Sequence, residues 1–227
     1  MATPVVEDYL QVIHFLTRDG YQVIAARLAE RLSVTPPTVT ATLQRMERDG
    51  LITHGPRKEI LFTEEGRTLA EGTVRRHALA ERLLTDLLKM PWPEAHEESH
   101  GFEHAITGKI EDRLLEVLGT PTTCPHGNPI PGLGALHPDE FPLSEAESGD
   151  EIQIQRITEE AEEDSDLMRY LQSHGVYPGA RMVVKESTKF NALIVLEGKT
   201  ASVSLGHPAA AKLRAVRVES PAAVAAH

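Results

Sequence analysis

The stretch that decides the fold lies at residues 35–50 and reads TPPTVTATLQRMERDG. Thr35 suits a helix N-cap, and Pro36 suits the first helical position because its missing backbone N–H needs no partner there. Gly50 supplies the left-handed conformation that ends many helices. Between them, apolar side chains recur at three- and four-residue steps: Val39, Leu43 and Met46. The sequence therefore predicts a helix over 35–49 with one apolar face.

Patterns on both sides extend this helix into a domain. Apolar spacing predicts two earlier helices, over 5–16 and 23–32, and a short polar turn over 33–35. Residues 51–62 read as a hairpin with a turn-rich centre. Helix, turn, helix and hairpin is the order of a winged helix-turn-helix, so residues 1–63 are predicted to form a DNA-binding domain. The alternative is a three-helix packing unit with a solvated polar face.

The outer face of the predicted recognition helix carries groups that donate to phosphates, touch thymine methyls or read base edges. The predicted contacts on this helix and the turn before it are Ser33, Pro37, Thr38, Thr40, Thr42, Gln44, Arg45 and Arg48. Arg57 and Lys58, at the hairpin tip, are predicted to meet backbone phosphate or the minor groove. Because the charge of this domain is nearly balanced, we expect binding by a homodimer to a palindromic operator in double-stranded DNA.

Composition narrows the class of protein. The 227 residues include 34 acidic and 23 basic side chains, for a formal net charge of -11. Such acidity argues against a sequence-blind nucleic-acid coat or a basic membrane anchor. No apolar stretch approaches the roughly 20 residues that span a bilayer, and the N-terminus has no signal-peptide pattern. The single cysteine, Cys124, forbids an intramolecular disulfide. We therefore expect a cytoplasmic protein without membrane contact.

Three further regions follow the predicted winged domain. Helical spacing continues over 64–120, and residues 121–148 are rich in proline and glycine, which predicts a linker or an extended arm. Five short alternating segments and one helix predict a small all-β barrel or sandwich over 149–219. Residues 220–227 read as a disordered tail. The predicted fold class is a mainly α N-terminal part followed by a small all-β domain.

Histidines and carboxylates gather in the second region at helical spacing. Residues 96–104 read HEESHGFEH, and a second pair lies one turn apart on the preceding helix. The candidate metal ligands, with one carboxylate from the first helix, are Asp8, His77, Glu81, His96, His100, Glu103 and His104. Imidazole with abundant carboxylate favours divalent first-row metals, and favours manganese or iron over zinc. The alternative is a solvated acidic helix with incidental histidines. Cys124, in the proline-rich region, is predicted to be incidental rather than a ligand.

The same string also satisfies a zinc-peptidase pattern. His96-Glu97-Glu98-Ser99-His100 matches H-E-x-x-H, in which two histidines bind zinc and Glu97 would be the general base. A hydrolase also needs a substrate cleft with an open metal position, and the rest of the chain offers no catalytic domain around this helix. We therefore predict that the chain is not an enzyme, with a zinc peptidase as the remote alternative. A third interpretation is a regulator of small organic ligands, whose DNA binding would not respond to chelators.

Several motifs, in this order, resemble one family: the metal-dependent repressors that include the diphtheria toxin repressor, the iron-dependent regulators and the manganese transport regulators. The motifs are RMERDGL at 45–51, RHALAERLL at 76–84, the string at 96–104 and GNPIPG at 127–132. GVYPG at 175–179 is similar to a turn in the SH3-like domain of the longer members, which is related to ferrous transport protein A. The resemblance covers nearly the whole chain. It implies a repressor of metal-ion homeostasis genes, with 64–120 as the dimerisation and metal-binding domain and 149–219 as an SH3-like barrel.

The resemblance also implies two metal sites. Glu103 and His104 match a regulatory site, in which Asp8 stands where the iron regulators have methionine and the manganese branch has aspartate. His100 stands where those two branches have cysteine and glutamate, and Gln11 replaces a carboxylate of the manganese branch, which argues against a two-metal arrangement of that type. A second, ancillary site is matched by His77, Glu81 and His96, joined from the SH3-like domain by Glu159 and Glu162. For this last pair, a solvated acidic loop is the alternative.

Replacing thioether and thiol by carboxylate and imidazole favours harder cations. We therefore predict Mn(II) as the co-repressor and Fe(II) as the second choice, so that an iron-dependent repressor is the alternative function. Zn, Co, Ni and Cd are expected to substitute in vitro. The predicted mechanism is that an ion shared by Asp8 and the 100–104 ligands restrains the orientation of the DNA-binding domain and shifts the population toward the DNA-competent arrangement.

Overall fold

The computed structural model describes residues 3–188, 190–199 and 201–218. The chain divides into two compact units. The first extends to His77 and also includes Glu103–Glu111. The second is formed by Ala78–Phe102 and by the chain from Asp112 onward. This division differs from the predicted boundary at residues 63 and 64, because the first half of the following helix packs against the winged domain. The predicted tail at 220–227 lies outside the described residues.

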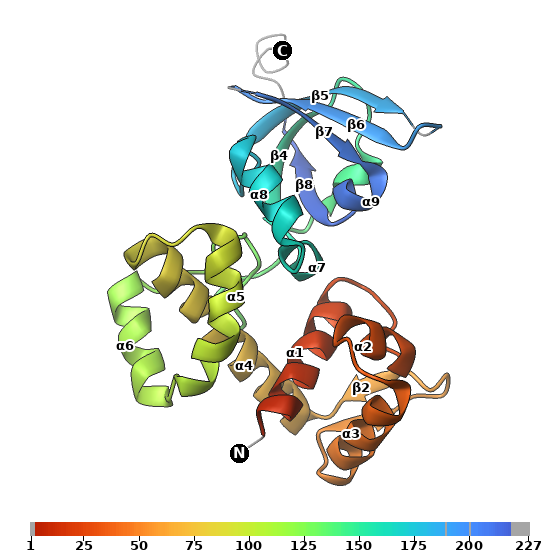
Figure 1. Ribbon diagram of the computed structural model, residues 1–227, viewed down its shortest axis with the longest axis vertical. Helices are drawn as coiled ribbons and strands as arrows, with labels where there is room; N and C mark the ends of the chain where they lie inside the picture. The colour runs from red at the N-terminus through yellow and green to blue at the C-terminus, as the bar shows by residue number, and fades with distance from the viewer. Residues whose placement is uncertain (1–2, 189, 200, 219–227) are drawn as a thin grey trace. The chain divides into compact units, whose positions relative to one another are not determined.

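The first unit begins with a winged helix-turn-helix (Figure 1). Its elements are α1 (Pro4–Arg18), α2 (Ala25–Arg31), α3 (Pro36–Arg48), β1 (Ile52–His54) and β2 (Ile60–Phe62). The two strands pair antiparallel as the wing, with Thr53 opposite Leu61. The three helices bury a single core that includes Leu10, Leu28 and Met46, each fully buried. Burial of this shared core fixes how α3 is held by α1.

A long helix, α4 (Glu64–Arg82), starts against this core and continues into a π-helical turn, η1 (Leu83–Leu87). The Thr63 hydroxyl accepts the Gly66 N–H at 3.0 Å and donates to the Gly50 carbonyl at 2.6 Å, which fixes the start of α4. The remaining helices are α5 (Trp92–Phe102), the 3-10 turn η2 (Glu103–Ala105) and α6 (Gly108–Leu118).

The C-terminal part of the second unit is a six-stranded antiparallel sheet in the order β3-β8-β4-β5-β6-β7 (Figure 1). The strands are β3 (Phe141–Pro142), β4 (Glu151–Ile157), β5 (Arg181–Thr188), β6 (Leu193–Glu197), β7 (Ser202–Gly206) and β8 (Leu213–Arg217). Short helical elements connect them: η3 (Leu143–Glu145), α7 (Glu159–Glu162), α8 (Ser165–Ser173) and α9 (His207–Ala210). Alternating side chains of the strands, with Met168 and Leu171 of α8, form its core.

The predicted fold class, helical and winged at the start and a small β domain at the end, is confirmed. All five predicted strands are present, whereas β3, α7 and α9 were not predicted. These elements have two to four residues, which is too short for a hydrophobic period to develop. The sheet also starts at Phe141, inside the segment predicted as linker, because β3 pairs with β8. Among the described residues, no helix is both long and apolar enough to cross a membrane.

The first part of the proline-rich segment, residues 123–131, is packed, whereas residues 135–139 are exposed to solvent. Ile130 is fully buried, and Gly127 has φ +88°. A Cβ at Gly127 would lie 2.2 Å from the Gln155 carbonyl oxygen, so only glycine allows the segment to lie directly on β4. This contact places Cys124 and His126 close to the C-terminal end of β4.

Candidate metal centres and DNA-binding surface

The first cluster of candidate ligands lies in the first unit and consists of Asp8, Glu103 and His104. One donor atom from each lies within 4.8 Å of the others. His104 Nε2 is 3.8 Å from Asp8 Oδ1 and 3.7 Å from Glu103 Oε1. The buried Glu103 comes from η2 and the half-exposed Asp8 from α1, so this arrangement joins the winged domain to the segment after α5.

Hydrogen bonds orient both oxygens of Glu103. The Gln11 amide donates to Oε1 at 2.7 Å, and His77 Nδ1 lies 2.6 Å from Oε2. His77, which the resemblance assigns to the ancillary site, therefore contacts the first cluster through this nitrogen. Gln11 supplies a donor where a further carboxylate would repel Glu103.

Electrostatics at this cluster favour a cation. Burial raises the pKa of Asp8 above its usual value, an effect that His104 opposes and that the carboxylates of Glu103 and Glu7 reinforce. Crowded carboxylates beside an imidazole are a donor set for a divalent first-row metal. The residues present therefore fit such an ion on their chemistry.

The second cluster lies in the second unit and is almost completely buried. Glu81 of α4, His96 of α5 and Glu162 of α7 meet there, with His96 Nδ1 at 2.9 Å from Glu81 Oε1 and 3.2 Å from Glu162 Oε2. Glu159, one turn before Glu162, also brings a carboxylate oxygen within 4.8 Å of donor atoms from His96 and Glu162. The acidic run at 158–164 thus supplies inward carboxylates rather than a solvated loop.

Two residues that were not predicted as ligands complete this cluster. His126 Nδ1 lies 3.0 Å from Glu162 Oε2 and 3.4 Å from Glu81 Oε1, and the Cys124 sulfur lies within 4.8 Å of donors from Glu81 and His126. Among the described residues, Nε2 of the fully buried His126 ring has no hydrogen-bond partner. Buried donors in that state are a fit for a metal ion.

Charges in the second cluster balance one another. Burial alone would lower the pKa of His96, but hydrogen bonds to Glu162 and Glu81 outweigh it and raise the pKa to about 9. Burial likewise opposes a charged His126, yet Glu162 and Glu81 raise its pKa well above the usual value. Burial opposes ionisation of Glu162, and the His126 charge outweighs it and lowers the pKa. Burial and Glu81 raise the pKa of Cys124 to about 12, so its thiol needs a neighbouring cation to ionise at neutral pH.

A buried polar network supports Glu162 through Oε1, the carboxylate oxygen that does not face the imidazoles. The Asn128 amide donates to Glu162 Oε1 and to the Ile157 carbonyl oxygen, both at 2.6 Å. Arg156 Nη1 donates to Asn128 Oδ1 at 3.1 Å, and the same guanidinium pairs with Glu140 at 2.7–3.2 Å. The proline-rich segment is thereby tied to the carboxylate through side chains that are 2% exposed.

His100 lies on α5 one turn after His96. It is exposed on α5, and its ring meets the His96 ring edge-on with centroids 4.9 Å apart. Glu97, the general base of the zinc-peptidase alternative, is also exposed on α5. The buried His96 ring is meanwhile engaged by two carboxylates.

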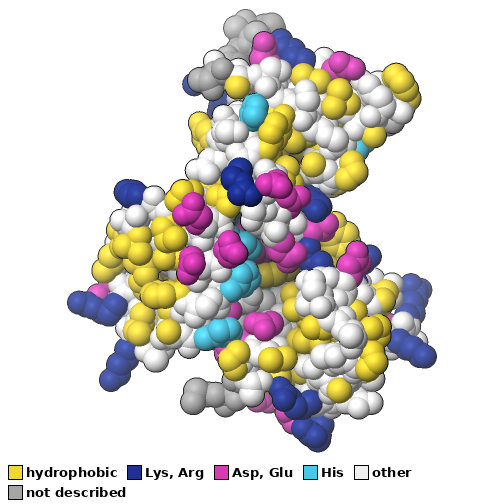
Figure 2. Space-filling view, viewed as in Figure 1, with side chains coloured by type: hydrophobic (Ala, Val, Ile, Leu, Met, Phe, Trp, Pro, Cys, Tyr) yellow, Lys and Arg dark blue, Asp and Glu magenta, His cyan; other side chains and the backbone are white. Residues whose placement is uncertain are grey.

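The predicted DNA contacts lie along α3 and the wing. Those that are exposed are Ser33, Pro37, Thr38, Thr40, Gln44, Arg48, Arg57 and Lys58, while Thr42 is half-buried. Figure 2 shows basic side chains standing out from the part of the molecule that α2, α3 and the wing form. Lys58 has φ +60°, which turns the wing tightly so that both basic residues sit at its tip.

Arg45 differs from the other predicted contacts. It is half-buried, and its Nη2 donates to Thr3 Oγ1 at 2.8 Å, the residue that precedes α1. Arg45 therefore links the recognition helix to the start of α1 instead of projecting outward.

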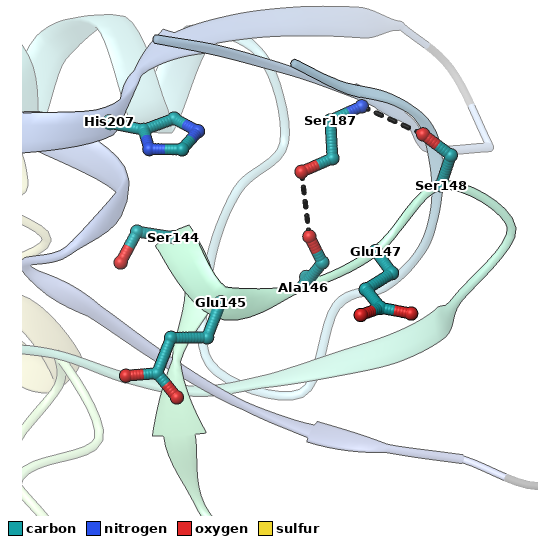
Figure 3. Close-up of a pocket in the computed structure, with 7 residues that line it drawn as sticks. All are labelled: Ser144, Glu145, Ala146, Glu147, Ser148, Ser187 and His207. Atoms are coloured by element: carbon teal, nitrogen blue, oxygen red, sulfur yellow. Dashed lines mark hydrogen bonds between the residues drawn. The ribbon is translucent and has the colours of Figure 1, made fainter. Parts of the chain in front are cut away.

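A separate groove of about 630 Å³ lies in the β domain (Figure 3). Ser187 of β5 is hydrogen-bonded to the segment that follows η3. Its N–H donates to Ser148 Oγ at 2.9 Å, and its hydroxyl donates to the Ala146 carbonyl oxygen at 2.7 Å. The residues that line it are Ser144, Glu145, Ala146, Glu147, Ser148, Ser187 and His207, and they include neither a candidate ligand nor a predicted DNA contact.

Comparison with known protein families matches three consecutive models to the chain. The iron-dependent repressor N-terminal DNA-binding domain matches residues 1–60. The iron-dependent repressor metal-binding and dimerisation domain matches 63–132, and the FeoA domain matches 141–217.

Individual proteins and structures agree with these models. The iron-dependent repressor IdeR of Mycobacterium leprae is 39% identical over 224 residues, covering 94% of this chain and 96% of that protein. The diphtheria toxin repressor of Corynebacterium diphtheriae is 44% identical over 130 residues, covering 57% of this chain and 58% of that protein. A solved manganese-dependent transcriptional repressor in complex with manganese is 32% identical with a TM-score of 0.85, covering 94% of this chain and all of that one. A structure of ScaR with bound zinc is 26% identical with a TM-score of 0.79, covering 94% of this chain and 99% of that one.

Proposed function

This chain belongs to the family of iron-dependent repressors, and we propose that it represses metal-ion homeostasis genes by binding a palindromic operator when Mn(II) is bound. Members of the family are metal-dependent, DNA-binding transcriptional repressors with a dimerisation domain. The prediction that the chain is not an enzyme is therefore confirmed, and the zinc-peptidase alternative falls. Because operator DNA lies in the cytoplasm in the bacteria that carry the relatives named above, we infer that this protein acts in the cytoplasm.

The observation that carries the proposal is the first cluster, in which Asp8, Glu103 and His104 bring two carboxylates and an imidazole together across α1 and η2. A divalent cation there would be held by the carboxylates of Asp8 and Glu103 and the imidazole of His104, and it would supply positive charge that offsets the repulsion between the two carboxylates. Asp8 lies on α1, whose opposite side packs into the core shared with α3. Holding Asp8 therefore restrains the recognition helix, and His100 is proposed as a further ligand from α5.

The second cluster is proposed to hold another metal ion. Its ligands come from Glu81, His96, Glu159 and Glu162, with Cys124 and His126 added by the structure and His77 by the resemblance. The strongest support for this assignment is the buried His126 ring, whose Nδ1 faces the carboxylates of Glu81 and Glu162 and whose Nε2 has no hydrogen-bond partner among the described residues. Because a thiol softens this donor set, the second cluster should accept Fe(II) and Zn(II) more readily than the first.

Two surfaces serve the proposed DNA complex. The exposed residues of α3 are proposed to enter the major groove of the DNA. Arg57 and Lys58 are proposed to contact the DNA backbone or the minor groove. Leu87 and Leu88, at the end of η1, are exposed at 47% and 62%, and Val117 of α6 is exposed at 63%. Figure 2 shows hydrophobic side chains gathering on this part of the molecule. We infer that these apolar residues contribute to the homodimer contact.

The test is operator binding with and without metal. Fluorescence anisotropy of a labelled palindromic duplex from upstream of a metal transporter gene is measured with Mn(II) and with chelator. Mn(II) is expected to tighten binding about a hundredfold, which is about 2.7 kcal/mol of coupling. If the operator affinity in chelator equals the affinity with Mn(II), the proposal is refuted. That result would favour a regulator that responds to small organic ligands.

Matched variants assign the response to the first cluster. Asp8→Asn and Glu103→Gln are expected to abolish the response to Mn(II) while the dimer stays folded. Glu30→Gln and Glu97→Gln remove the same charge from exposed positions on α2 and α5, and both should respond like the wild type.

The alternative is that Fe(II) is the main co-repressor. The curated relatives are named as iron-dependent repressors, and the buried Cys124 thiol adds a soft donor to the second cluster. Anaerobic titrations with Fe(II) and Mn(II) on the same duplex separate the two. Half-maximal binding at a lower Fe(II) concentration would make iron the co-repressor.

A further inference from the structure

Glu7 neighbours Asp8 on α1, and both oxygens of its carboxylate are engaged. Its side chain is 18% exposed. Oε2 lies 2.7 Å from His104 Nδ1, and Oε1 accepts a hydrogen bond from Arg76 Nη2 at 3.0 Å. Glu7 therefore touches a residue of the first cluster from behind rather than facing the space between the three donors.

The contact with Glu7 decides which nitrogen of His104 faces the cluster. With Nδ1 against the Glu7 carboxylate, Nε2 points toward Asp8 and Glu103, at 3.8 and 3.7 Å. A carboxylate that accepts the Nδ1 proton leaves the lone pair of a neutral imidazole on Nε2. Metal-binding histidines commonly have their second nitrogen fixed in this way, which sets the ring orientation and raises its basicity.

Arg76 holds Glu7 in this position from α4. The Nη2 that donates to Glu7 also donates to Thr73 Oγ1 at 3.1 Å, and Thr73 is 1% exposed. The Thr73 hydroxyl in turn donates to the Leu69 carbonyl oxygen. The guanidinium also neutralises the Glu7 charge, so a third carboxylate can stand beside Asp8 and Glu103 at lower electrostatic cost.

We propose that Glu7 is a positioning residue that fixes the ring orientation and tautomer of His104 for metal binding, with Arg76 as its anchor on α4. This inference rests on the proposed metal-dependent function. It assigns Glu7 no place among the ligands, because both of its oxygens have other partners. It also gives α4 a second contact with the first cluster, in addition to the contact of His77 with Glu103.

The experiment measures the Mn(II) concentration that gives half-maximal operator binding, in the full-length protein. Glu7→Gln is expected to raise this concentration about 10- to 100-fold, the range seen when such supporting carboxylates are removed. At saturating Mn(II), operator affinity should return to within twofold of the wild type, since the variant keeps the DNA surface. Glu30→Gln serves as the charge-matched control and should not move the midpoint.

A double-mutant cycle separates positioning from general stabilisation. The cycle uses Mn(II) affinity measured directly by equilibrium dialysis, since loss of the His104 ligand is expected to abolish the operator response. If Glu7 acts through His104, Glu7→Gln weakens Mn(II) binding by less than a further twofold in a His104→Ala background. Equal factors in both backgrounds, or a midpoint for Glu7→Gln within twofold of the wild type, would overturn the inference. Thermal unfolding by circular dichroism confirms that each variant is folded. Failure of the proposed function is distinguishable, because the wild type would then show no dependence on Mn(II) at all.

Discussion

Arg156 lies at the centre of the network that links the proline-rich segment to Glu162, so its loss should be costly. Its side chain is 2% exposed, and the Glu140 carboxylate that it pairs with is 11% exposed. Three nitrogen–oxygen distances of 2.7–3.2 Å join the two, and Asn128 takes a further guanidinium N–H. Arg156→Met keeps the aliphatic length but leaves a nearly buried carboxylate without its cation. Breaking a buried pair in this way lowers the free energy of unfolding by about 3–5 kcal/mol. Because Glu140 keeps 11% of its exposure, we expect a loss of about 3 kcal/mol, at the lower end of that range.

Urea unfolding followed by Trp92 fluorescence measures this loss, because Trp92 is the single tryptophan and its ring meets His126 in the same unit. Arg169→Met is the control: Arg169 is 60% exposed in a pair with Asp166, so a change below about 0.5 kcal/mol is expected. In the double variant Arg156→Met/Glu140→Leu, the destabilisation should be at least about 2 kcal/mol smaller than the sum of the single changes. Additive changes, or a loss below about 1 kcal/mol for Arg156→Met, would refute the buried-pair argument.

Three further predictions follow from other sites. Gly66→Ala should destabilise the first unit by about 1–3 kcal/mol in thermal unfolding, because the new Cβ would lie 1.8 Å from the Leu51 carbonyl oxygen. Gly72→Ala is the control: its new Cβ would meet only a side-chain atom, at 3.6 Å, so this change should be neutral or stabilising. Burial and nearby arginines lower the pKa of His14 to about 4, so the unfolded chain binds the extra proton below pH 6.5. Stability should therefore fall by about 3 kcal/mol from pH 6.5 to 4, and His14→Gln should flatten this slope in urea titrations followed by circular dichroism. Cys124→Ser should abolish thiolate-to-metal absorption of the Co(II)-loaded protein and leave a Co(II) signal from the first cluster; unchanged absorption would exclude the thiol as a ligand.

The helices and strands with several turns or alternations could be read from the sequence, because each needs one buried face. The recognition helix is the clearest case, where Val39, Leu43 and Met46 repeat at helical steps and are all buried. The two-residue strand β3 could not be read this way, since its pairing with β8 depends on residues some seventy positions away. Where local spacing determines the structure, sequence is sufficient.

The candidate metal ligands show the same limit. His77 and Glu81 lie one turn apart on α4, and His96 and His100 lie one turn apart on α5, so the helical faces of these ligands could be predicted. Cys124 and His126 follow no such period, and their approach to Glu81 depends on Gly127 lying against β4. A Cys-x-His pair next to glycine in a rigid proline-rich segment was the available signal. Glu7 had none, because an acidic residue in the first turn of a helix is already explained by the helix dipole.

The two faces of α1 explain how binding at the cluster can reach DNA. Leu10 and Ile13 are fully buried in the core shared with α3, while Asp8 and Gln11 face Glu103 and His104. Since a packed helix moves as a unit, a charge that pulls on Asp8 also biases the position of α3. The coupling must be reciprocal: if Mn(II) tightens operator binding a hundredfold, the operator must tighten Mn(II) binding by the same factor. Measuring Mn(II) affinity with and without duplex therefore tests the coupling independently of any DNA titration, and unequal factors would mean that a step outside this two-state scheme contributes.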